Sequence, residues 1–261
     1  MIPSTLPIAA LVCLTLAVPQ FHATAQTSYY SPSFLPDTPI AAVIEPRIDA
    51  GTLYRIIQPI TTATEYANGI VEYNNGNGFI VGNRFYTVNH NLASSNHVPK
   101  LRKTSYVNGV VVRAMRVSAD HDLAVFPLPD ELCKSHCNDL SLNEHVTVQQ
   151  GQEVFWLRKF DGQVVIKRGR VLDYAWIGES PPSRDRVGRC DGRMVVQIDT
   201  PFLPGTSGSP VIDSETGQII GIAQGSLFSE RQQSGFFKPL NCLKKLRGND
   251  SGITLTGNFV D

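Results

Sequence analysis

Seven residues decide the fold of this chain: Pro204-Gly205-Thr206-Ser207-Gly208-Ser209-Pro210, which the apolar pair Val211-Ile212 follows directly. A serine in such a turn is able to expose its hydroxyl as a nucleophile while nearby backbone N–H groups point at one oxyanion. Glycine, serine and proline are also the ordinary residues of a tight turn between strands. The choice depends on whether the chain also supplies a base and an acid that orients it.

The positions of the histidines restrict the possible partners of Ser207. All six histidines precede it in the chain. A hydrolase of the α/β type needs a histidine after its nucleophile, and its G-x-S-x-G motif fails here because Ser209 stands where the last glycine belongs. The remaining chain orders are His, Asp, Ser and Asp, His, Ser. The histidines are His22, His90, His97, His121, His136 and His145.

Two segments supply the order His, Asp, Ser. Residues 85–90 form a β-rich run that ends at His90, and Asp122 directly precedes an apolar run. A carboxylate at the edge of such a strand is able to accept the Nδ1 proton of an imidazole and fix its tautomer. We interpret His121 as a solvent-facing neighbour, and we predict that His90 and Asp122 complete a catalytic set with Ser207.

The order Asp, His, Ser has weaker support. Asp37 and Asp49 precede His90, but neither lies in the D-[ST]-G setting that subtilisin-like enzymes use. His90 is also not followed by glycine. We therefore set this order aside.

With the Ser207 turn, five further segments give the chain a resemblance to chymotrypsin-fold serine peptidases, in particular to HtrA-type and other bacterial trypsin-like enzymes. Residues 76–81 (GNGFIV) resemble their G-S-G-F-I-I motif, and residues 86–90 (YTVNH) resemble their histidine strand. Residues 122–125 (DLAV) resemble the run around their catalytic aspartate. Residues 217–222 (GQIIGI) and 235–239 (GFFKP) resemble their later strands G-E-V-I-G-I and G-F-A-I-P. The ordered set makes the resemblance specific.

The resemblance implies an all-β fold of two antiparallel six-stranded β-barrels of the chymotrypsin type, with a short C-terminal helix. The 21 glycines and 17 prolines agree with a chain of many strands and turns. The helical pattern opens at Pro239 and places Leu240, Leu243 and Leu246 on one face. The expected strands include residues 69–73, 78–81, 107–112, 146–148, 153–157 and 164–166, with Asn-Gly and Asp-Gly turn signals among them.

The resemblance also implies a role for each candidate residue. His90 takes the proton of Ser207 as this serine attacks a peptide carbonyl, and Asp122 orients the imidazole. The backbone N–H groups of Gly205 and Ser207 hold the oxyanion. No metal or organic cofactor is expected. The expected substrate pocket consists of Pro201, Phe202, Gln224, Gly225, Ser226 and Gly235.

Two departures from trypsin bear on activation and specificity. Thr206 stands where trypsin-type enzymes have the aspartate that pairs with a newly cut N-terminus, so we do not expect that form of zymogen activation. The absence of an acid at position 201 argues against lysine or arginine as the P1 residue and favours an apolar or small one.

The predicted function is that of an exported serine endopeptidase with a protein or peptide substrate. The alternative is a catalytically silent peptidase fold that serves as a peptide-binding or chaperone module.

The first 25 residues are predicted to be a signal peptide, because the apolar residues 8–18 precede small residues at Ala23 and Ala25. We therefore expect a periplasmic or secreted protein, without stable membrane insertion after signal removal. The predicted later regions are a leader (26–52), the peptidase domain (53–247) and a tail (248–261). Within the domain, the first barrel covers about 53–128, the linker 129–145 and the second barrel about 146–238.

The charge balance gives no support for a nucleic-acid partner or an anionic membrane partner. Lysine plus arginine and aspartate plus glutamate both number 23, so the formal net charge is zero at pH 7. Proteins that bind polyanions usually carry a clear excess of basic residues.

Removal of the signal peptide leaves four cysteines, an even number in a compartment that is expected to be oxidising. Three pairings are possible, and we favour Cys133 with Cys137, in the linker, and Cys190 with Cys242. Cys133, His136 and Cys137 also bring three potential metal ligands together. Because no fourth ligand is evident, a disulfide is preferred to a metal site.

Overall fold

The structure, a computed structural model, describes most of the chain between residues 50 and 243. The chain divides into two compact units, Met1–Leu35 and Pro36–Asp261, and every described residue belongs to the second unit. The predicted signal peptide and tail lie outside the described residues, so the predicted domain boundaries stay predictions. The described residues are 50–94, 99–113, 116–138, 142, 145, 147–160, 162–176, 194–228 and 233–243.

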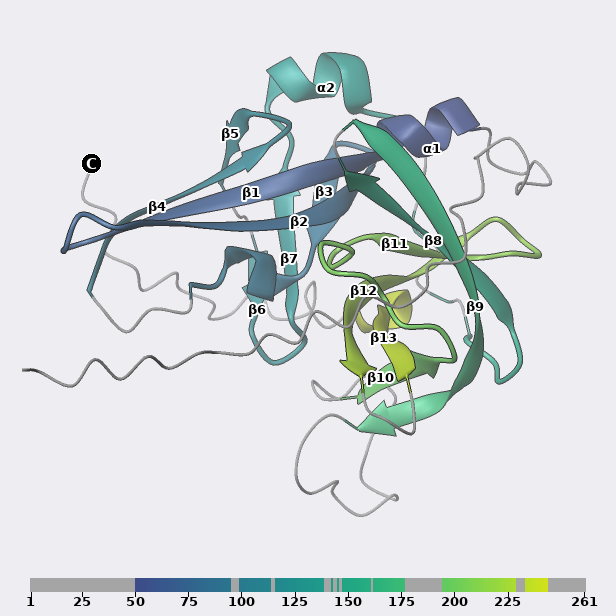
Figure 1. The fold of residues 1–261 in the computed structure, drawn as a ribbon. Coiled ribbons are helices and arrows are strands. Elements are labelled where there is room, and N and C mark those ends of the chain that lie inside the picture. The colour runs from purple at the N-terminus through teal and green to yellow at the C-terminus, as the bar shows by residue number, and fades with distance from the viewer. Residues whose placement is uncertain are drawn as a thin grey trace, which may run out of the picture. The chain divides into compact units, whose positions relative to one another are not determined.

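The C-terminal half of the described chain forms a closed antiparallel barrel of six strands, as the sequence predicts. The strands follow the order β10-β13-β12-β11-β8-β9 (Figure 1), and buried residues such as Val154, Trp156 and Val196 fill the interior. The barrel begins later than expected, because residues 147–148 lie in no strand. Its strands are β8 (Glu153–Phe160), β9 (Gln163–Trp176), β10 (Met194–Ile198), β11 (Pro210–Asp213), β12 (Ile219–Phe228) and β13 (Gln233–Pro239).

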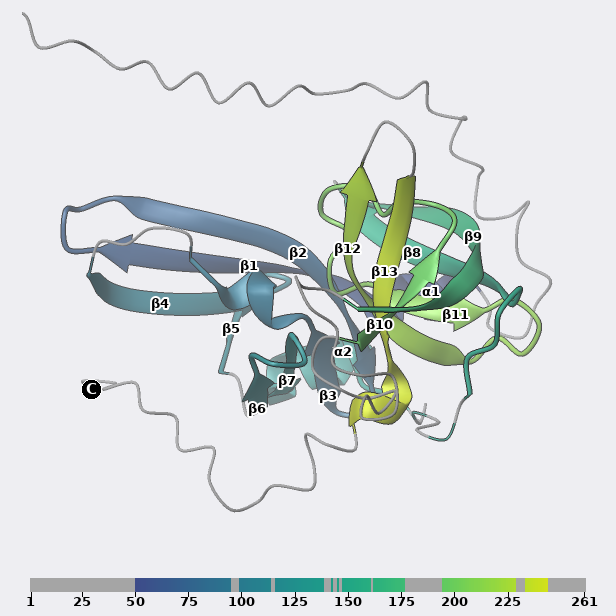
Figure 2. The same cartoon turned by 90° about the horizontal axis from the view of Figure 1, so that it is seen from below.

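The N-terminal half forms a seven-stranded antiparallel sheet in the order β5-β4-β1-β2-β3-β7-β6. The long strands β1, β2 and β4 run side by side in both views (Figures 1 and 2). The edge strands β5 and β6 have three residues each, and within the described residues no pairing joins them. This half is therefore a seven-stranded half-barrel sheet, which together with the closed barrel agrees with the predicted all-β fold of the chymotrypsin type. Its strands are β1 (Ile57–Tyr66), β2 (Val71–Val81), β3 (Arg84–Thr87), β4 (Lys100–Val107), β5 (Val110–Val112), β6 (Arg116–Ser118) and β7 (Leu123–Pro127).

A turn interrupts one of the predicted strands. The sequence predicts a single strand over residues 107–112, but Asn108 and Gly109 adopt left-handed backbone conformations, with φ of 48° and 80°. They form a two-residue connection in which Val107 pairs with Val110. Asn-Gly favours this connection because both residues tolerate a positive φ.

A helix, α1 (Ala50–Ile56), occupies the positions where the first barrel was expected to begin. Leu53 and Ile56 are three residues apart and buried, whereas Tyr54 and Arg55 are exposed. This spacing gives the helix one apolar face, which packs against the core.

The structure describes the expected C-terminal helix only up to Leu243. The described part is the 3-10 helix η4 (Leu240–Leu243), and both of its leucines and Cys242 are buried. Leu246 and Cys190 lie outside the described residues, so the pairing of Cys190 with Cys242 stays a prediction. Among the helices that the structure describes, none combines the length and apolar character that a membrane span needs.

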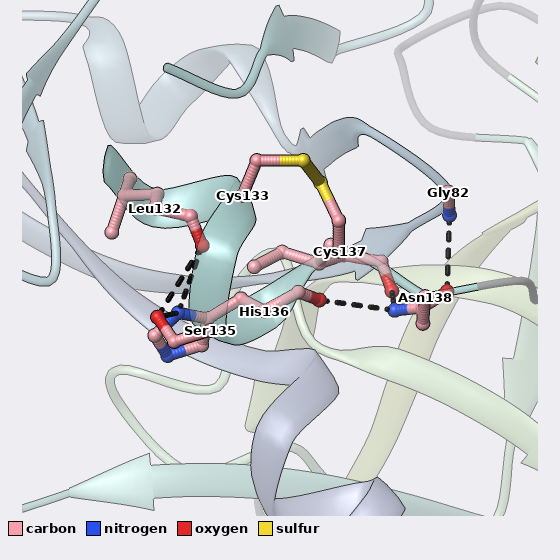
Figure 3. The surroundings of a disulfide bond; sticks show 8 residues. Gly82, Leu132, Cys133, Ser135, His136, Cys137 and Asn138 are labelled. Carbon is pink, nitrogen blue, oxygen red and sulfur yellow. Dashed lines mark hydrogen bonds between the residues drawn. A yellow bond between two sulfur atoms is a disulfide. The ribbon is translucent and has the colours of Figure 1, made fainter. Parts of the chain in front are cut away.

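The predicted linker contains a helix, α2 (Asp130–His136), with a disulfide at its C-terminal end (Figure 3). The bond joins Cys133 and Cys137, whose Cα atoms are 4.5 Å apart. It uses both sulfur atoms that the alternative metal site would need. The next residue, Asn138, accepts the N–H of Gly82 at 3.0 Å through its side chain. The disulfide and Asn138 therefore tie α2 to the β2–β3 turn.

One hydrophobic cluster contains residues from both halves of the fold. Phe79 and Tyr86 come from the first sheet, Phe155 and Ile212 from the barrel, and Leu53 from α1. Each half also has a cluster of its own. Because burial of apolar surface is favourable, the shared cluster holds the barrel and the sheet together, and with them the turn that carries Ser207.

Candidate active site

Asp122 makes two hydrogen bonds to His90. His90 lies in the 3-10 helix η2 (Asn89–Leu92), close after β3, and Asp122 immediately precedes β7. Oδ2 of Asp122 lies 2.7 Å from Nδ1 of His90, and Oδ1 accepts the backbone N–H of His90 at 2.8 Å. The carboxylate therefore fixes both the ring and the main chain of His90. It also favours the tautomer that carries its proton on Nδ1.

The backbone of Asp122 helps to aim this carboxylate. Its φ is 52°, in the left-handed region, which aspartate tolerates better than most residues. Its N–H donates to the carbonyl of Ala119 at 3.1 Å and closes a tight turn. The side chains of His90 and Asp122 remain 42% and 28% exposed, so the imidazole is open to a ligand.

Glycines allow the tight turn that carries Ser207. Gly205 and Gly208 have positive φ angles of 81° and 88°. A Cβ atom at Gly208 would lie 1.9 Å from the backbone oxygen of Asn77, so only glycine fits at this position. The turn is also held to the barrel, because the N–H of Gly208 donates to the carbonyl of Ala223 at 2.8 Å.

Two N–H groups of the turn have no hydrogen-bond acceptor among the described residues. The N–H of Thr206 donates to Leu203 at 3.0 Å, and that of Ser209 donates to Thr206 at 2.9 Å. The N–H groups of Gly205 and Ser207 make no such bond with any residue that the structure describes. These are the two groups that the sequence predicts as oxyanion donors.

The hydroxyl of Ser207 points to the barrel. Its Oγ donates to the carbonyl of Gln224 at 3.2 Å, and among the described residues it makes no hydrogen bond to His90. The main chain of Ser207 is nevertheless held beside the histidine. Asn91, the neighbour of His90, donates from Nδ2 to the Ser207 carbonyl at 3.0 Å. The structure thus joins His90 to Asp122 directly, and it joins Ser207 to them through this backbone contact.

The predicted pocket residues gather where β12 and β13 meet the segment that follows β10. Ser226 Oγ accepts the N–H of Phe202 at 2.6 Å and donates to its carbonyl at 3.0 Å. Gly235 lies opposite Ser226 in the sheet, and a Cβ atom there would lie 2.7 Å from the Thr200 carbonyl. Gly225 pairs with Phe236, and Pro201 is half-buried beside Phe202. Gln224 supplies the carbonyl that Ser207 contacts.

His121 has a structural contact that the sequence did not indicate. Its carbonyl accepts the side-chain N–H of Gln224 at 2.9 Å, and its ring Nδ1 lies 2.9 Å from the hydroxyl of Ser118. His121 is therefore half-buried rather than simply solvent-facing. The Gln224 bond links the loop of Asp122 to β12, the strand beside Ser207.

Sequence reasoning also missed two asparagines at the boundary between the halves. Asn77 and Asn91 are almost fully buried, and both contact the Ser207 turn. One available signal was that Asn77 stands where the related G-S-G motif has serine. The polar surroundings include Lys159, whose Nζ donates to Gln58 at 3.3 Å and lies 4.1 Å from the ring centre of Tyr54. Burial lowers the pKa of the Lys159 ammonium.

Solved structures with similar folds are proteases. The chain matches the Rv3671c protease of M. tuberculosis in its active form with 18% identity and a TM-score of 0.54, covering 77% of this chain and 83% of that one. It matches the HtrA-type protease AlgW with tripeptide at 16% identity and a TM-score of 0.52, covering 77% and 63%. It matches the MamO protease domain of Magnetospirillum magneticum at 18% identity and a TM-score of 0.50, covering 74% and 96%.

Comparison of the sequence with protein-family models also identifies a peptidase. The model of the trypsin-like peptidase domain matches residues 76–222, which include His90, Asp122 and Ser207 and make up more than half of the chain. The chain therefore belongs to the trypsin-like peptidase family.

Proposed function

We propose that this protein is an exported serine endopeptidase that cleaves peptide bonds with His90, Asp122 and Ser207. The observation that carries the proposal is the pair of hydrogen bonds that the Asp122 carboxylate accepts from His90, because they orient the imidazole as a base. Membership of the trypsin-like peptidase family supplies the class of reaction. The predicted signal peptide supports a periplasmic or secreted location.

Ser207 is the proposed nucleophile. Rotation of its side chain away from Gln224 directs Oγ toward Nε2 of His90, which takes the hydroxyl proton while Oγ bonds to the substrate carbonyl carbon. The carbonyl electron pair moves to the oxygen, which the N–H groups of Gly205 and Ser207 stabilise. His90 then returns the proton to the amine as the C–N bond breaks. Water hydrolyses the acyl-enzyme by the same steps.

The proposed substrate is a protein or peptide with an apolar or small P1 residue. The predicted pocket holds the ring of Phe202, whose centre lies 4.9 Å from that of the buried Trp156, and no acid occupies position 201. A cationic P1 side chain would therefore find no charged partner at that position. Support for a peptide ligand comes from the HtrA-type protease AlgW, whose structure contains a tripeptide.

A fluorophosphonate-rhodamine probe and fluorescent casein test this function. We expect the wild type to react with the probe and to digest casein. Ser207→Ala loses both reactions, because the nucleophile is gone. Ser214→Ala is the matched control, since Ser214 is exposed in the turn after β11, and it keeps both reactions.

The contact between Ser207 and Gln224 supports a second candidate, a silent peptidase fold that binds peptides without cleaving them. In that case, neither the wild type nor Ser207→Ala reacts with the probe, casein stays intact, and both proteins bind casein-derived peptides with equal affinity. This result would overturn the proposed endopeptidase.

A further inference from the structure

We infer that Asn77 is a positioning residue that sets the geometry of the oxyanion site, an inference that rests on the proposed function. Asn77 lies in β2 of the first sheet and is 2% exposed. It contacts both residues whose N–H groups are the proposed oxyanion donors. Its side chain holds Gly205 and its main chain holds Ser207.

Both polar atoms of the Asn77 side chain form hydrogen bonds. Nδ2 of Asn77 donates to the carbonyl of Gly205 at 2.5 Å, and Oδ1 accepts the backbone N–H of Lys159 in β8 at 3.2 Å. One carboxamide therefore bridges the Ser207 turn and a neighbouring strand of the barrel. This bridge needs a donor at one end and an acceptor at the other, and the carboxamide of asparagine carries these on two separate atoms. Ionised aspartate has no donor, and serine has only one polar atom on a shorter side chain.

The main chain of Asn77 completes the clamp. Its N–H donates to the carbonyl of Ser207 at 2.8 Å. Its own carbonyl accepts the hydroxyl of Thr87 at 2.6 Å and Nδ2 of Asn91 at 3.3 Å. Because these partners are themselves buried, Asn77 has little freedom to move.

The clamp matters because Gly205 has no side chain to hold its peptide groups. A glycine with φ of 81° reaches other backbone conformations without a steric penalty. The bond to Asn77 fixes the carbonyl of Gly205, and the bond from Thr206 N–H to Leu203 fixes the other side of the same peptide group. The N–H of Gly205 belongs to the preceding peptide group and that of Ser207 to the following one, so fixing this central group, together with the carbonyl of Ser207, restrains the direction of both donors. A transition-state oxyanion depends on that direction more than a bound substrate does.

Asn77→Asp is the sharpest variant, because it keeps the size of the side chain and the acceptor for Lys159 but removes the donor to Gly205. Asn77→Ser is a second variant that removes the bridge without adding charge. The matched control is Asn75→Asp, which adds the same charge two positions away on β2, where Asn75 is exposed. All proteins are used as full chains, and their thermal midpoints show whether they fold.

The measurement is the rate of inactivation by fluorophosphonate, resolved into kinact and KI. A donor misplaced by about 1 Å lowers kinact about 100-fold in Asn77→Asp and Asn77→Ser, with KI within about threefold of the wild type. Asn75→Asp behaves as the wild type does. Loss of stability alone would lower the fraction of active protein rather than kinact.

The outcomes separate the two proposals. If the wild type reacts and either folded Asn77 variant has the kinact of Asn75→Asp, the positioning role is wrong while the endopeptidase stands. If the wild type does not react, the proposed function itself fails. If Asn77→Asp does not fold, Asn77→Ser decides the matter by the same comparison.

Discussion

A single residue, Asp122, shows how local backbone conformation supports the proposed catalytic role. Its left-handed backbone turns the carboxylate toward two donors of the same residue, the backbone N–H and the ring of His90. The two carboxylate oxygens provide one acceptor for each donor. The backbone strain is small for aspartate, and the same conformation would cost a bulky or branched residue considerably more.

We predict that Asp122→Asn folds but loses most activity. Asparagine tolerates the left-handed backbone, so the free energy of unfolding changes little. Its side-chain NH₂ group is unable to accept the Nδ1 proton of His90, so the proton moves to Nε2, where the base is needed. We expect kcat for casein-derived peptides to fall about 10⁴-fold. The control is Asp120→Asn, which changes an exposed residue two positions earlier and keeps the wild-type kcat. A kcat of Asp122→Asn within tenfold of this control would contradict the proposed role of Asp122.

At the scale of residues, the sequence predicted which side chains contact each other but not the direction in which each one points. His90 and Asp122 were found because their order and their β-rich context narrow the choice, and the structure places them in contact. The direction of the Ser207 hydroxyl was not predictable. It depends on a carbonyl of Gln224, 17 positions later, that only the pairing of β11 with β12 brings near. The bridging role of Asn77 depends on packing between the halves in the same way.

At the scale of elements, the turn between β10 and β11 is shaped by contacts with β2. Gly208 lies against this strand, since a Cβ atom there would overlap the Asn77 carbonyl at 1.9 Å. The turn and the strand fit together only because this position lacks a side chain. The position therefore serves packing as well as backbone conformation.

We predict that Gly208→Ala destabilises the protein more than Gly109→Ala does. Both glycines have positive φ, 88° and 80°, so both substitutions carry a cost of about 1–2 kcal/mol for an L-residue in that region. A methyl group at Gly109 meets no heavy atom within 4 Å. At Gly208 the overlap adds about 1–3 kcal/mol. Urea unfolding measures both, and equal losses would show that the turn shifts freely away from β2.

Turns and strands were predicted best where a few neighbouring residues determine the backbone conformation. The two-residue signal Asn108-Gly109 marks its turn correctly, although the strand drawn across it over residues 107–112 was wrong. The closure of a sheet depends on which distant strands meet. In β2, for example, the first five residues are exposed or half-buried, so they do not line a barrel interior. Local pattern therefore identified strands but not that β5 and β6 are unpaired with each other among the described residues.

At the scale of the whole molecule, the proposed catalytic residues come from both halves of the fold. His90 and Asp122 come from the sheet, and Ser207 comes from the barrel. The hydrophobic cluster that joins the halves includes Leu53 of α1 and Phe155 of β8. Because the halves share this cluster, opening one exposes apolar surface of the other, and the energetic cost links their unfolding.

We predict that both halves unfold in one transition. Trp156 and Trp176, the two tryptophans of the chain, lie in barrel strands, so their fluorescence reports on the barrel, while far-UV circular dichroism reports on both halves. The urea midpoints from the two signals should coincide. Leu53→Ala removes a buried side chain of the shared cluster and should lower both midpoints together, by an amount equivalent to about 2–5 kcal/mol. Ile70→Ala, at a position that is 51% exposed, should leave both unchanged. Separate midpoints, or a Leu53→Ala effect on only one signal, would mean that the halves fold independently and that their boundary is not what holds Ser207 beside His90.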